Sequence, residues 1–359
     1  MKTIAFHIGS LIDGGAERVI CNLANYFAQQ EYEVYMITNE MEDREYHKLD
    51  DKVKRIVMPQ PNGGRVKNII SRVTILRKTI KEVHADVVVA FMRKQNLRAI
   101  LATRCMPTKV IVSVRSAPER EYSTRLQQIL AKVLFRMAEG AVFQTEMARN
   151  FFGKSVQKKS VILMNPLLGD FSKSRFEGTR KKEIVTVGRL HSVKNHELLI
   201  RAFSRVNVEY PELKLTIYGD GEHKEQLEQL IKTLQLEQKV QLPGHCDDVA
   251  NTIDRSLLFA LTSNTEGMPN ALLEAMAMGL PVISTDCPCG GPAMLIQNGV
   301  NGILIPVGDE DALVKAIRTL IDKPQYADQL GREAEKVKEL YAPEKVYKMW
   351  NDYIEKVLA

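Results

Sequence analysis

The stretch SNTEGMPNALLEAMAMGLPVIST, residues Ser263–Thr285, carries the clearest structural signal in the chain. The apolar run Leu257–Leu261 before it predicts a buried strand. Pro269 suits a first helical position, apolar residues continue the helix, and Gly279 ends it. Residues Val282–Thr285 then form the next strand. The stretch predicts strand, turn, helix and strand, which is the repeating unit of a parallel α/β sheet.

The turn before this helix is acidic and favours a ligand that has phosphates and hydroxyls. Backbone N–H groups at a helix N-terminus are free to bind an anion, and the helix dipole favours negative charge there. Glu266 lies in the turn and Glu274 within the helix, where carboxylates would accept hydrogen bonds from sugar hydroxyls. We expect the element to hold a nucleotide sugar, although two such glutamates are also typical of a solvated surface or a helix cap.

Length and composition are those of a soluble enzyme with two domains. The chain has 359 residues, of which 45% are hydrophobic and 26% charged. No apolar run reaches the roughly 18 residues that a membrane span needs. The chain opens directly on a strand-like segment, Thr3–Ile8, so we expect a cytoplasmic protein without a secretory signal. Cys287 and Cys289 lack a second pair at metal-site spacing, and we expect no bound metal and no cofactor.

The positive charge is concentrated in the first half of the chain. Residues 1–170 hold 27 Lys and Arg against 17 Asp and Glu, whereas the remainder holds 23 against 27. Between Arg65 and Arg136 the imbalance is 16 against 4. A basic half points to an anionic partner such as lipid headgroups, a diphosphate-linked acceptor or nucleic acid, and the alternative is an ordinary solvated face.

Strand and helix patterns alternate along the chain and restart once. In the first half the predicted strands lie at residues 3–8, 34–38, 86–91, 109–114, 141–144 and 161–164, with helices at 16–29, 68–83 and 125–139. Residues 167–182 are polar and basic and read as a linker. The pattern then begins again at residue 183. We expect an α/β protein of two doubly wound Rossmann-like domains that face each other across a cleft.

A second signal follows a predicted strand in the second half, where the sequence reads GRLHSVKN over residues 188–195. Arg189 and Lys194 belong to one loop and could reach the same anion. A guanidinium fork and a lysine charge would suit a diphosphate leaving group, whose negative charge grows in the transition state. Ordinary surface cations in a helix-capping loop are the alternative.

Weaker signals come from other glycine-containing turns. Gly244 and His245 end a strand, and their backbone groups could pair with a base. The turn Tyr218–Glu222 is better explained as a tight turn before a helix. Near the N-terminus, Gly14 and Gly15 precede the first helix at a spacing that is not the dinucleotide fingerprint G-x-G-x-x-G. The turns share one feature, since each would lie at the carboxyl end of a parallel strand.

Taken together, GGAERV in the first turn, NP at residues 165–166, GRLHSVKN, YGDGE and EGMPNALLEAMAMGLPVIST resemble the retaining glycosyltransferases of family 4, which have the GT-B fold. The resemblance covers about residues 1–340 and is most specific in the second half. It implies transfer of a hexose or N-acetylhexosamine from a nucleotide sugar, with retention and without a metal. It implies an acceptor domain at residues 1–168, a donor domain at 169–342, and a final helix at 343–359 that crosses back.

The family pattern also assigns roles to single residues. It implies that Arg189 and Lys194 meet the donor diphosphate, that Glu266 meets the sugar beside the reacting carbon, and that Glu274 meets the ribose. Gly14 and Gly15 would approach the diphosphate, and Gly15 also the acceptor. The remaining donor-binding residues are the backbone groups of the phosphate cradle and of the base site: Gly267, Met268, Pro269, Asn270, Ala271, Gly244 and His245.

One position departs from that pattern. Many members carry a histidine after the strand that here reads Ile111–Val114, whereas this chain has Arg115 in the sequence SVRSAP. Arginine stays protonated and cannot serve as a general base, so we expect Arg115 to bind an acceptor phosphate or the sugar. The Ser-x-Arg form with GGAER resembles a bacterial subgroup that builds lipid-linked oligosaccharides, capsules and exopolysaccharides.

The helix predicted at residues 125–139 bears on a membrane partner. Its apolar residues fall at helical spacing, with Arg125, Lys132 and Arg136 beside them: Leu126, Ile129, Leu130, Val133, Leu134 and Met137. Such a helix could lie on anionic headgroups at the inner face of the cell membrane. Packing in the protein core is the alternative, and the sequence favours it.

Three other functions fit the sequence less well. A sugar-nucleotide epimerase would need histidines placed as acid and base, and His7, His191, His196 and His245 are better explained as structural or solvent-facing. A phosphorylase would need a pyridoxal-binding lysine context, which is not evident. A nucleic-acid binder would need aromatic stacking residues among the basic ones, yet Phe, Tyr and Trp make up only 6% of the chain.

Overall fold

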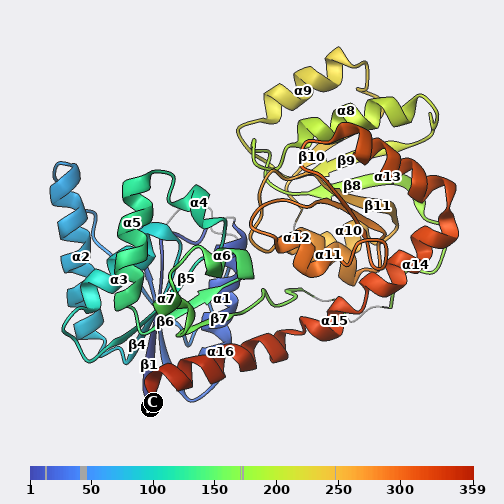
Figure 1. Cartoon of the computed structure of the whole chain (residues 1–359). Helices are drawn as coiled ribbons and strands as arrows, with labels where there is room; N and C mark the ends of the chain where they lie inside the picture. Colours follow the sequence, from blue (N-terminus) through green and yellow to red (C-terminus); the bar gives the residue numbers. More distant parts are fainter. Residues whose placement is uncertain (13, 41–46, 170, 172–173, 247) are drawn as a thin grey trace. The chain divides into compact units, whose positions relative to one another are not determined.

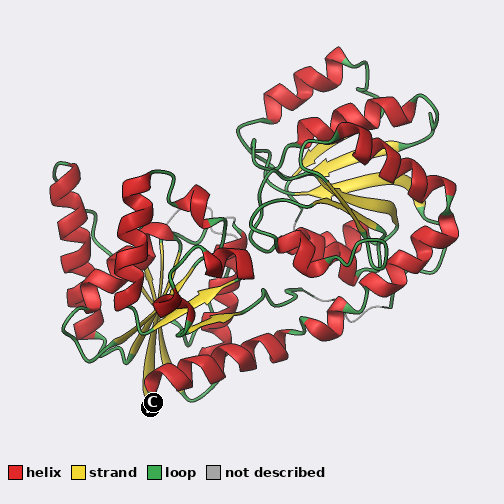
Figure 2. Ribbon diagram, in the orientation of Figure 1, coloured by secondary structure: helices red, strands yellow, loops and turns green. Residues whose placement is uncertain are grey.

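The computed structural model of the chain describes residues 1–12, 14–40, 47–169, 171, 174–246 and 248–359, in two compact units (Figures 1 and 2). The first unit comprises Met1–Pro166 with Glu344–Ala359, and the second comprises Leu167–Pro343. Each contains one parallel sheet with helices. The prediction of two doubly wound α/β domains is confirmed. The predicted boundaries at residues 168 and 342 lie within two residues of these limits.

The first unit is built on a seven-stranded sheet in the order β3-β2-β1-β4-β5-β6-β7. The inner strands β1, β4, β5 and β6 are almost wholly buried because helices cover both faces of a parallel sheet, whereas the edge strands β3 and β7 are partly exposed. The strand order reverses between β1 and β4, and ligands of such folds bind at that switch point. The strands are β1 (Lys2–Ile8), β2 (Tyr32–Thr38), β3 (Lys54–Val57), β4 (Val87–Phe91), β5 (Lys109–Ser113), β6 (Gly140–Phe143) and β7 (Ser160–Ile162).

The helices of this unit lie where the chain crosses between strands, and two predicted ends were wrong. The helix predicted at 68–83 begins three residues earlier, and the one predicted at 125–139 ends in a 3₁₀ turn, η1 (Phe135–Met137). The α-helices are α1 (Gly15–Ala28), α2 (Arg65–Glu82), α3 (Arg93–Thr103), α4 (Pro118–Glu121), α5 (Arg125–Leu134), α6 (Glu146–Asn150), α7 (Lys154–Gln157) and α16 (Pro343–Leu358).

The last helix, α16, packs on the first unit although it follows the second in sequence (Figure 1). Trp350 is fully buried and stacks on Phe91 of β4, with ring centroids 5.8 Å apart. The Tyr353 hydroxyl accepts a hydrogen bond from the Ala141 N–H at 2.8 Å. The apolar stripe of α16 thus completes the core of the first unit.

Three helices of the first unit lie side by side in the order α2, α3, α5 (Figure 1). They connect β3 to β4, β4 to β5 and β5 to β6, three crossovers that run in the same direction across the sheet, and right-handed crossovers of one direction place their helices on one face. Helix α1 crosses in the opposite direction, and its Tyr26 stacks on Tyr347 of α16 with ring centroids 4.6 Å apart. These two helices therefore share the other face.

The second unit has a six-stranded sheet in the order β10-β9-β8-β11-β12-β13, with the switch point between β8 and β11. Helix α8 buries Leu199, Phe203 and Val206 completely at helical spacing. The strands are β8 (Lys181–Val187), β9 (Lys214–Tyr218), β10 (Val240–Gly244), β11 (Ser256–Leu261), β12 (Val282–Thr285) and β13 (Ile303–Ile305). The helices are α8 (His196–Asn207), α9 (Lys224–Thr233), α10 (Val249–Ile253), α11 (Asn270–Ala277), α12 (Gly291–Leu295), α13 (Glu310–Asp322), α14 (Pro324–Ala334) and α15 (Val337–Leu340).

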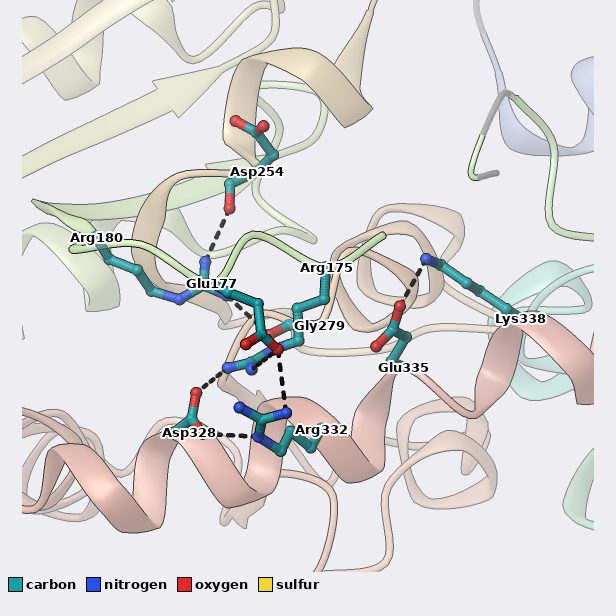
Figure 3. A network of polar contacts seen from close by, with 9 residues as sticks. All are labelled: Arg175, Glu177, Arg180, Asp254, Gly279, Asp328, Arg332, Glu335 and Lys338. Carbon is teal, nitrogen blue, oxygen red and sulfur yellow. Dashed lines mark hydrogen bonds and ion pairs between the residues drawn. The ribbon is translucent and has the colours of Figure 1, made fainter. Parts of the chain in front are cut away.

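The described part of the segment predicted as a linker is held firmly by the second unit (Figure 3). Arg175 is buried, its Nε donates to the Gly279 carbonyl at 3.1 Å, and it forms an ion pair with Asp328. Arg180 donates to the same carbonyl at 3.1 Å. Residues 170 and 172–173 of the segment lie outside the described part. The arginines that made the segment look solvated instead bind carbonyls and a carboxylate.

Candidate functional site

The strongest candidate site lies at the carboxyl ends of β8 and β11, the two strands that flank the switch point of the second sheet. The turn at residues 188–195 follows β8, and the turn at residues 262–269 follows β11. Because the strands are neighbours and parallel, their turns emerge side by side. The two motifs that the sequence singled out are thus brought together by the sheet.

Hydrogen bonds join the two turns into one frame. The Asn264 N–H donates to the Val193 carbonyl at 2.7 Å, and the Asn195 side-chain amide lies 3.1 Å from the Asn264 side-chain oxygen. The Thr262 hydroxyl donates to the Lys194 carbonyl at 3.2 Å. Asn195 itself has a left-handed backbone (φ 48°), which asparagine tolerates well, and it caps α8. The frame fixes the backbone from which the functional side chains project.

Glu266 is at the centre of this frame. Its Oε1 accepts from the Lys194 ammonium at 2.6 Å and from the Ser263 hydroxyl at 2.6 Å. The Lys194 and Glu266 side chains are only 22% and 12% exposed, so water screens the pair little. The prediction placed Lys194 at the diphosphate and Glu266 at the sugar. The structure brings the two groups into direct contact before any ligand arrives.

The loop that contains Cys287 and Cys289, which in the sequence was considered only as a metal site, is hydrogen-bonded to the backbone of Glu266. The Glu266 N–H donates to the Pro288 carbonyl at 2.9 Å, and the Cys289 N–H donates to the Glu266 carbonyl at 3.4 Å. A Cβ on Gly291 would lie 1.5 Å from the Gly267 carbonyl oxygen, so no other residue fits there. Burial raises the pKa of the Cys287 thiol to about 12. The adjacent glycines 290 and 291 were the signal that could have identified this support.

Helix α11 starts where the turn ends. Pro269 is the N-cap rather than the first helical residue, which is Asn270, so that prediction was wrong by one position. Gly267, Met268 and Pro269 are buried, whereas Asn270 and Ala271 are partly exposed. Glu274 follows in the second turn and is buried. The helix ends at Gly279 (φ 65°), whose N–H and that of Leu280 bond back to the last turn.

Arg189 projects from the same frame toward solvent. Its side chain is exposed, while its backbone carbonyl accepts a hydrogen bond from the His196 ring at 3.2 Å. Burial lowers the pKa of His196 to about 4, so the ring stays neutral. This neutral ring has a structural role. The guanidinium of Arg189 is left available for an anion at the mouth of the frame.

The other predicted donor residues lie further along the same edge. Gly244 and His245 end β10, two strands from β8, and the His245 N–H donates to the Asp220 carboxylate at 3.0 Å. A Cβ on Gly219 (φ 138°) would lie 2.1 Å from the Gly188 carbonyl oxygen. The turn that contains Gly219 therefore packs against the first turn of the frame, in line with a tight structural turn.

In the first unit, Arg115 follows β5 and is buried against an aromatic ring. Its guanidinium carbon lies 4.8 Å from the centre of the Phe91 ring, and its Nη2 donates to the Asn165 side-chain oxygen. The Gln144 amide donates to the same oxygen at 2.7 Å. This bonding gives the asparagine of the NP pair a role, which is to hold Arg115 in place.

Two donors of Arg115 lack a partner. Its Nε and Nη1 are buried and make no hydrogen bond to the described residues. Burial lowers the pKa of Arg115 to about 9, and the nearby Glu121 carboxylate partly opposes that shift. Burial also raises the pKa of Glu121 to about 7. A buried guanidinium with two free donors is the arrangement expected where an anionic or hydroxyl-bearing ligand completes the bonding.

Gly14 and Gly15 lie at the start of α1, close to the switch point of the first sheet. Gly14 is the N-cap in an extended conformation, and Gly15 is the first helical residue and exposed. A Cβ on Gly14 would lie 2.1 Å from a carboxylate oxygen of Glu17. Asp13, in the same turn, lies outside the described residues. Burial lowers the pKa of His7, in β1, to about 4, and its Nδ1 lies 3.0 Å from the Ile37 carbonyl oxygen.

Within the described part of the chain, no three His, Cys, Asp or Glu side chains gather as a metal site requires. No described helix is both long and apolar enough to cross a membrane.

Comparison with known proteins gives matches along nearly the whole chain. A family model described as Glycosyltransferase Family 4 matches residues 13–161, and one described as Glycosyl transferases group 1 matches residues 170–337. An α-1,4-N-acetyl-D-galactosaminyltransferase of Campylobacter jejuni, which acts on a diphospho-undecaprenol-linked saccharide, is 27% identical over 93% of each chain. An amylovoran biosynthesis glycosyltransferase of Erwinia amylovora is 25% identical over 95% of this chain and 96% of its own.

A solved structure has the same fold. Alr3699/HepE of Anabaena, in complex with UDP and glucose, superposes with a TM-score of 0.85 over 99% of this chain and 100% of its own, at 19% identity. At that identity the likeness concerns the fold, which is the GT-B arrangement of two α/β domains.

Proposed function

This chain belongs to the glycosyltransferases, with a family 4 region followed by a group 1 region, and from that premise we propose that it is a retaining, metal-independent enzyme with a UDP-sugar donor. It would move a hexose or N-acetylhexosamine to a lipid-linked or saccharide acceptor in bacterial glycan biosynthesis. The observation that carries the proposal is the frame at the switch point, in which the Lys194 ammonium contacts the Glu266 carboxylate and from which the exposed Arg189 projects.

The donor would bind at this frame. Arg189 is exposed at its mouth, and Lys194 is 2.6 Å from Glu266, so a diphosphate could take over the ammonium while the carboxylate turns to the sugar hydroxyls. The backbone N–H groups at the start of α11 would add to the phosphate cradle. Glu274, the pair Gly244 and His245, and Gly14 and Gly15 keep the ribose, base and diphosphate roles proposed from the family pattern. UDP is the nucleotide bound by the Anabaena protein of the same fold.

The reaction would be a displacement on the front face of the sugar. The bond from the anomeric carbon to the phosphate oxygen breaks, and the acceptor oxygen forms its bond on the same face, which retains the configuration. The acceptor proton passes to the departing phosphate oxygen. The protein would position both substrates and stabilise the charge that grows on the diphosphate through Arg189 and Lys194. His7 and His196 are buried and neutral, which supports a mechanism without a histidine base.

The acceptor would bind in the first unit, at Arg115 and Gly15. The free Nε and Nη1 donors of Arg115 suit a phosphate oxygen or a sugar hydroxyl. The Campylobacter relative acts on a diphospho-undecaprenol-linked saccharide, and an acceptor of that class would supply both groups. The basic first unit would then meet anionic headgroups at the inner face of the membrane.

A donor screen by nucleotide release tests the proposal. Purified protein is incubated with UDP-, GDP- and ADP-sugars and a polyprenyl-diphosphate-linked saccharide, and the anomeric configuration of the product is determined. We expect release of UDP and a product with the configuration of the donor. An inverted product would refute the front-face mechanism, and the absence of turnover with every donor would refute the enzyme assignment.

Thermal denaturation separates this function from a nucleic-acid binder, and the fate of the sugar nucleotide separates it from an epimerase. UDP should raise the melting temperature because it binds only the folded protein, whereas RNA should not. Stabilisation by RNA alone would favour a nucleic-acid binder. Interconversion of the sugar nucleotide without transfer would favour an epimerase.

A further inference from the structure

Helix α5 turns its apolar face toward solvent. Leu126, Ile129, Leu130 and Val133 follow the spacing of one helical face, and they are 46% to 76% exposed. The buried residues of α5 are Ala131 and Leu134. The sequence favoured packing of the apolar stripe in the core, which holds for Leu134 and is wrong for these four residues.

Helix α2 repeats the arrangement. Val66, Ile69 and Ile70 have the same spacing and are 51% to 71% exposed, and the half-buried Val73 extends the row. A shallow hollow beside them is lined by Pro61 and Ile70 among others. Two helices of one unit thus expose an aliphatic row of the kind that proteins normally bury.

Both rows lie at the same end of the first unit. Helices α2 and α5 flank α3 on one face of the sheet (Figure 1). A crossover helix runs opposite to its parallel strands, so both helices start at the carboxyl edge of the sheet. The exposed residues occupy their first two or three turns. Arg115, which follows β5, lies at this edge too.

The charges around the two aliphatic rows indicate which kind of partner would bind them. Helix α5 contains no acidic residue, and in α2 the only one is Glu82 at its end. Lys67 and Arg125 are exposed beside the rows. A second copy of the chain would bring two basic surfaces together, which repel each other. Nucleic acid would need aromatic stacking side chains, and these rows are aliphatic. Aliphatic rows bordered by cations match an anionic bilayer surface.

We propose that the first turns of α2 and α5 form a two-helix membrane-docking face, which inserts seven aliphatic side chains between anionic lipid headgroups. The proposal deepens the membrane association proposed above and rests on it. Docking there would bring the carboxyl edge of the first sheet, with Arg115, close to the bilayer from which a lipid-linked acceptor presents its saccharide.

Tryptophan scanning tests the insertion directly. Trp350 is the only native tryptophan and is fully buried, so its emission supplies a constant background. The variants Leu126→Trp and Ile69→Trp, on α5 and α2, should each show a blue shift with vesicles of phosphatidylcholine and phosphatidylglycerol. Val208→Trp is the matched control, because Val208 is 81% exposed on the second unit, and its emission should not shift.

Vesicle sedimentation measures the contribution of each helix. The pairs Leu126→Ser/Ile129→Ser and Val66→Ser/Ile70→Ser should each weaken binding to the same vesicles by at least about tenfold. Val208→Ser should bind like the unaltered protein. High salt should weaken binding, and pure phosphatidylcholine should bind least.

The outcomes are separable from those of the enzyme assignment. Stabilisation by UDP should be unchanged in every variant, since the donor frame belongs to the second unit. If the unaltered protein does not bind anionic vesicles, the docking face is refuted even if UDP binds. It is also refuted if the serine variants bind the vesicles as well as the unaltered protein. A protein that dimerises through these rows in solution, with a monomer produced by the serine pairs, would overturn it in favour of self-association.

Discussion

The two candidate sites both lie at the carboxyl edge of a parallel sheet, the first at the switch point and the second one strand beyond it, yet they are built in opposite ways. At the donor frame, Lys194 and Glu266 neutralise each other and the turns behind them are hydrogen-bonded to one another. At the Arg115 corner, the Nε and Nη1 of a buried cation make no hydrogen bond to the described residues. The first site thus pairs its charges internally, whereas the second leaves part of a buried guanidinium unpaired within the described part of the chain.

The difference follows from what each site would have to do. A frame that stabilises charge growing on a leaving group gains from groups fixed in advance, because no reorganisation is then needed during reaction. A corner that recognises a separate acceptor gains from unsatisfied donors, since a ligand without matching acceptors leaves them buried and unpaired. The contrast predicts large catalytic effects in the second unit and effects on acceptor binding in the first.

The largest effect should come from the cations of the frame. Lys194→Ala and Arg189→Ala should each lower kcat at saturating donor about 100-fold or more, because each removes a charge that stabilises the departing diphosphate. Steady-state nucleotide release measures this, and Arg201→Ala, an exposed arginine of α8, is the control. Near-full activity in both variants would show that the frame is not the site of charge stabilisation.

The second largest effect concerns Gly219, whose turn packs against the first turn of the frame. Gly219→Ala should lower the free energy of unfolding by about 2 kcal/mol or more, because it combines a left-handed φ of 138° with a Cβ 2.1 Å from the Gly188 carbonyl oxygen. Urea denaturation gives the value. Gly64→Ala is the matched control, since a Cβ there meets no atom within 4 Å. Equal stability of the two variants would mean that the turns of the second unit are not tightly packed.

At the Arg115 corner the expected effect is smaller and of another kind. Arg115→Met should raise the acceptor KM by about tenfold and leave stabilisation by UDP unchanged. The variant should be at least as stable as the parent, because burial already disfavours the charge, as the lowered pKa of Arg115 indicates. A loss of stability with an unchanged acceptor KM would make Arg115 a structural residue, and the contrast between the sites would fail.

The smallest effect is shared by both units. Burial lowers the pKa of His7 and of His196 to about 4, from an ordinary value of 6.5. The unfolded chain therefore binds more protons in this range, and stability should fall as the pH drops from about 6.5 toward 4. Melting temperatures measured across that range should decline less in His196→Gln than in the parent. An identical decline would assign the acid sensitivity to other groups.

Much of the frame at the ends of β8 and β11 was predictable because its parts are short and local. The residues of Ser263–Thr285 and of the strand just before it are enough to predict the strand, turn, helix and strand there. The cations of the second turn can be read directly from residues 188–195. The predicted helix ends were wrong by one residue or a few, because helix ends depend on caps and packing. At α11, for example, Pro269 is the N-cap and not the first helical residue. The linker prediction failed because Arg175 is polar in sequence but finds its partners 104 and 153 residues away.

The sequence by itself determined two doubly wound domains, the switch-point turns and the residue types that they carry, because hydrophobic periodicity and glycine turns act over a few residues. Only the tertiary structure decided which of these groups meet. Lys194 and Glu266 are 72 positions apart and follow the neighbouring strands β8 and β11. Arg115 and Asn165 are 50 apart and follow β5 and β7, which have β6 between them. It also decided that the apolar rows of α2 and α5 face outward, because a helix pattern records an apolar stripe but not the surface that covers it.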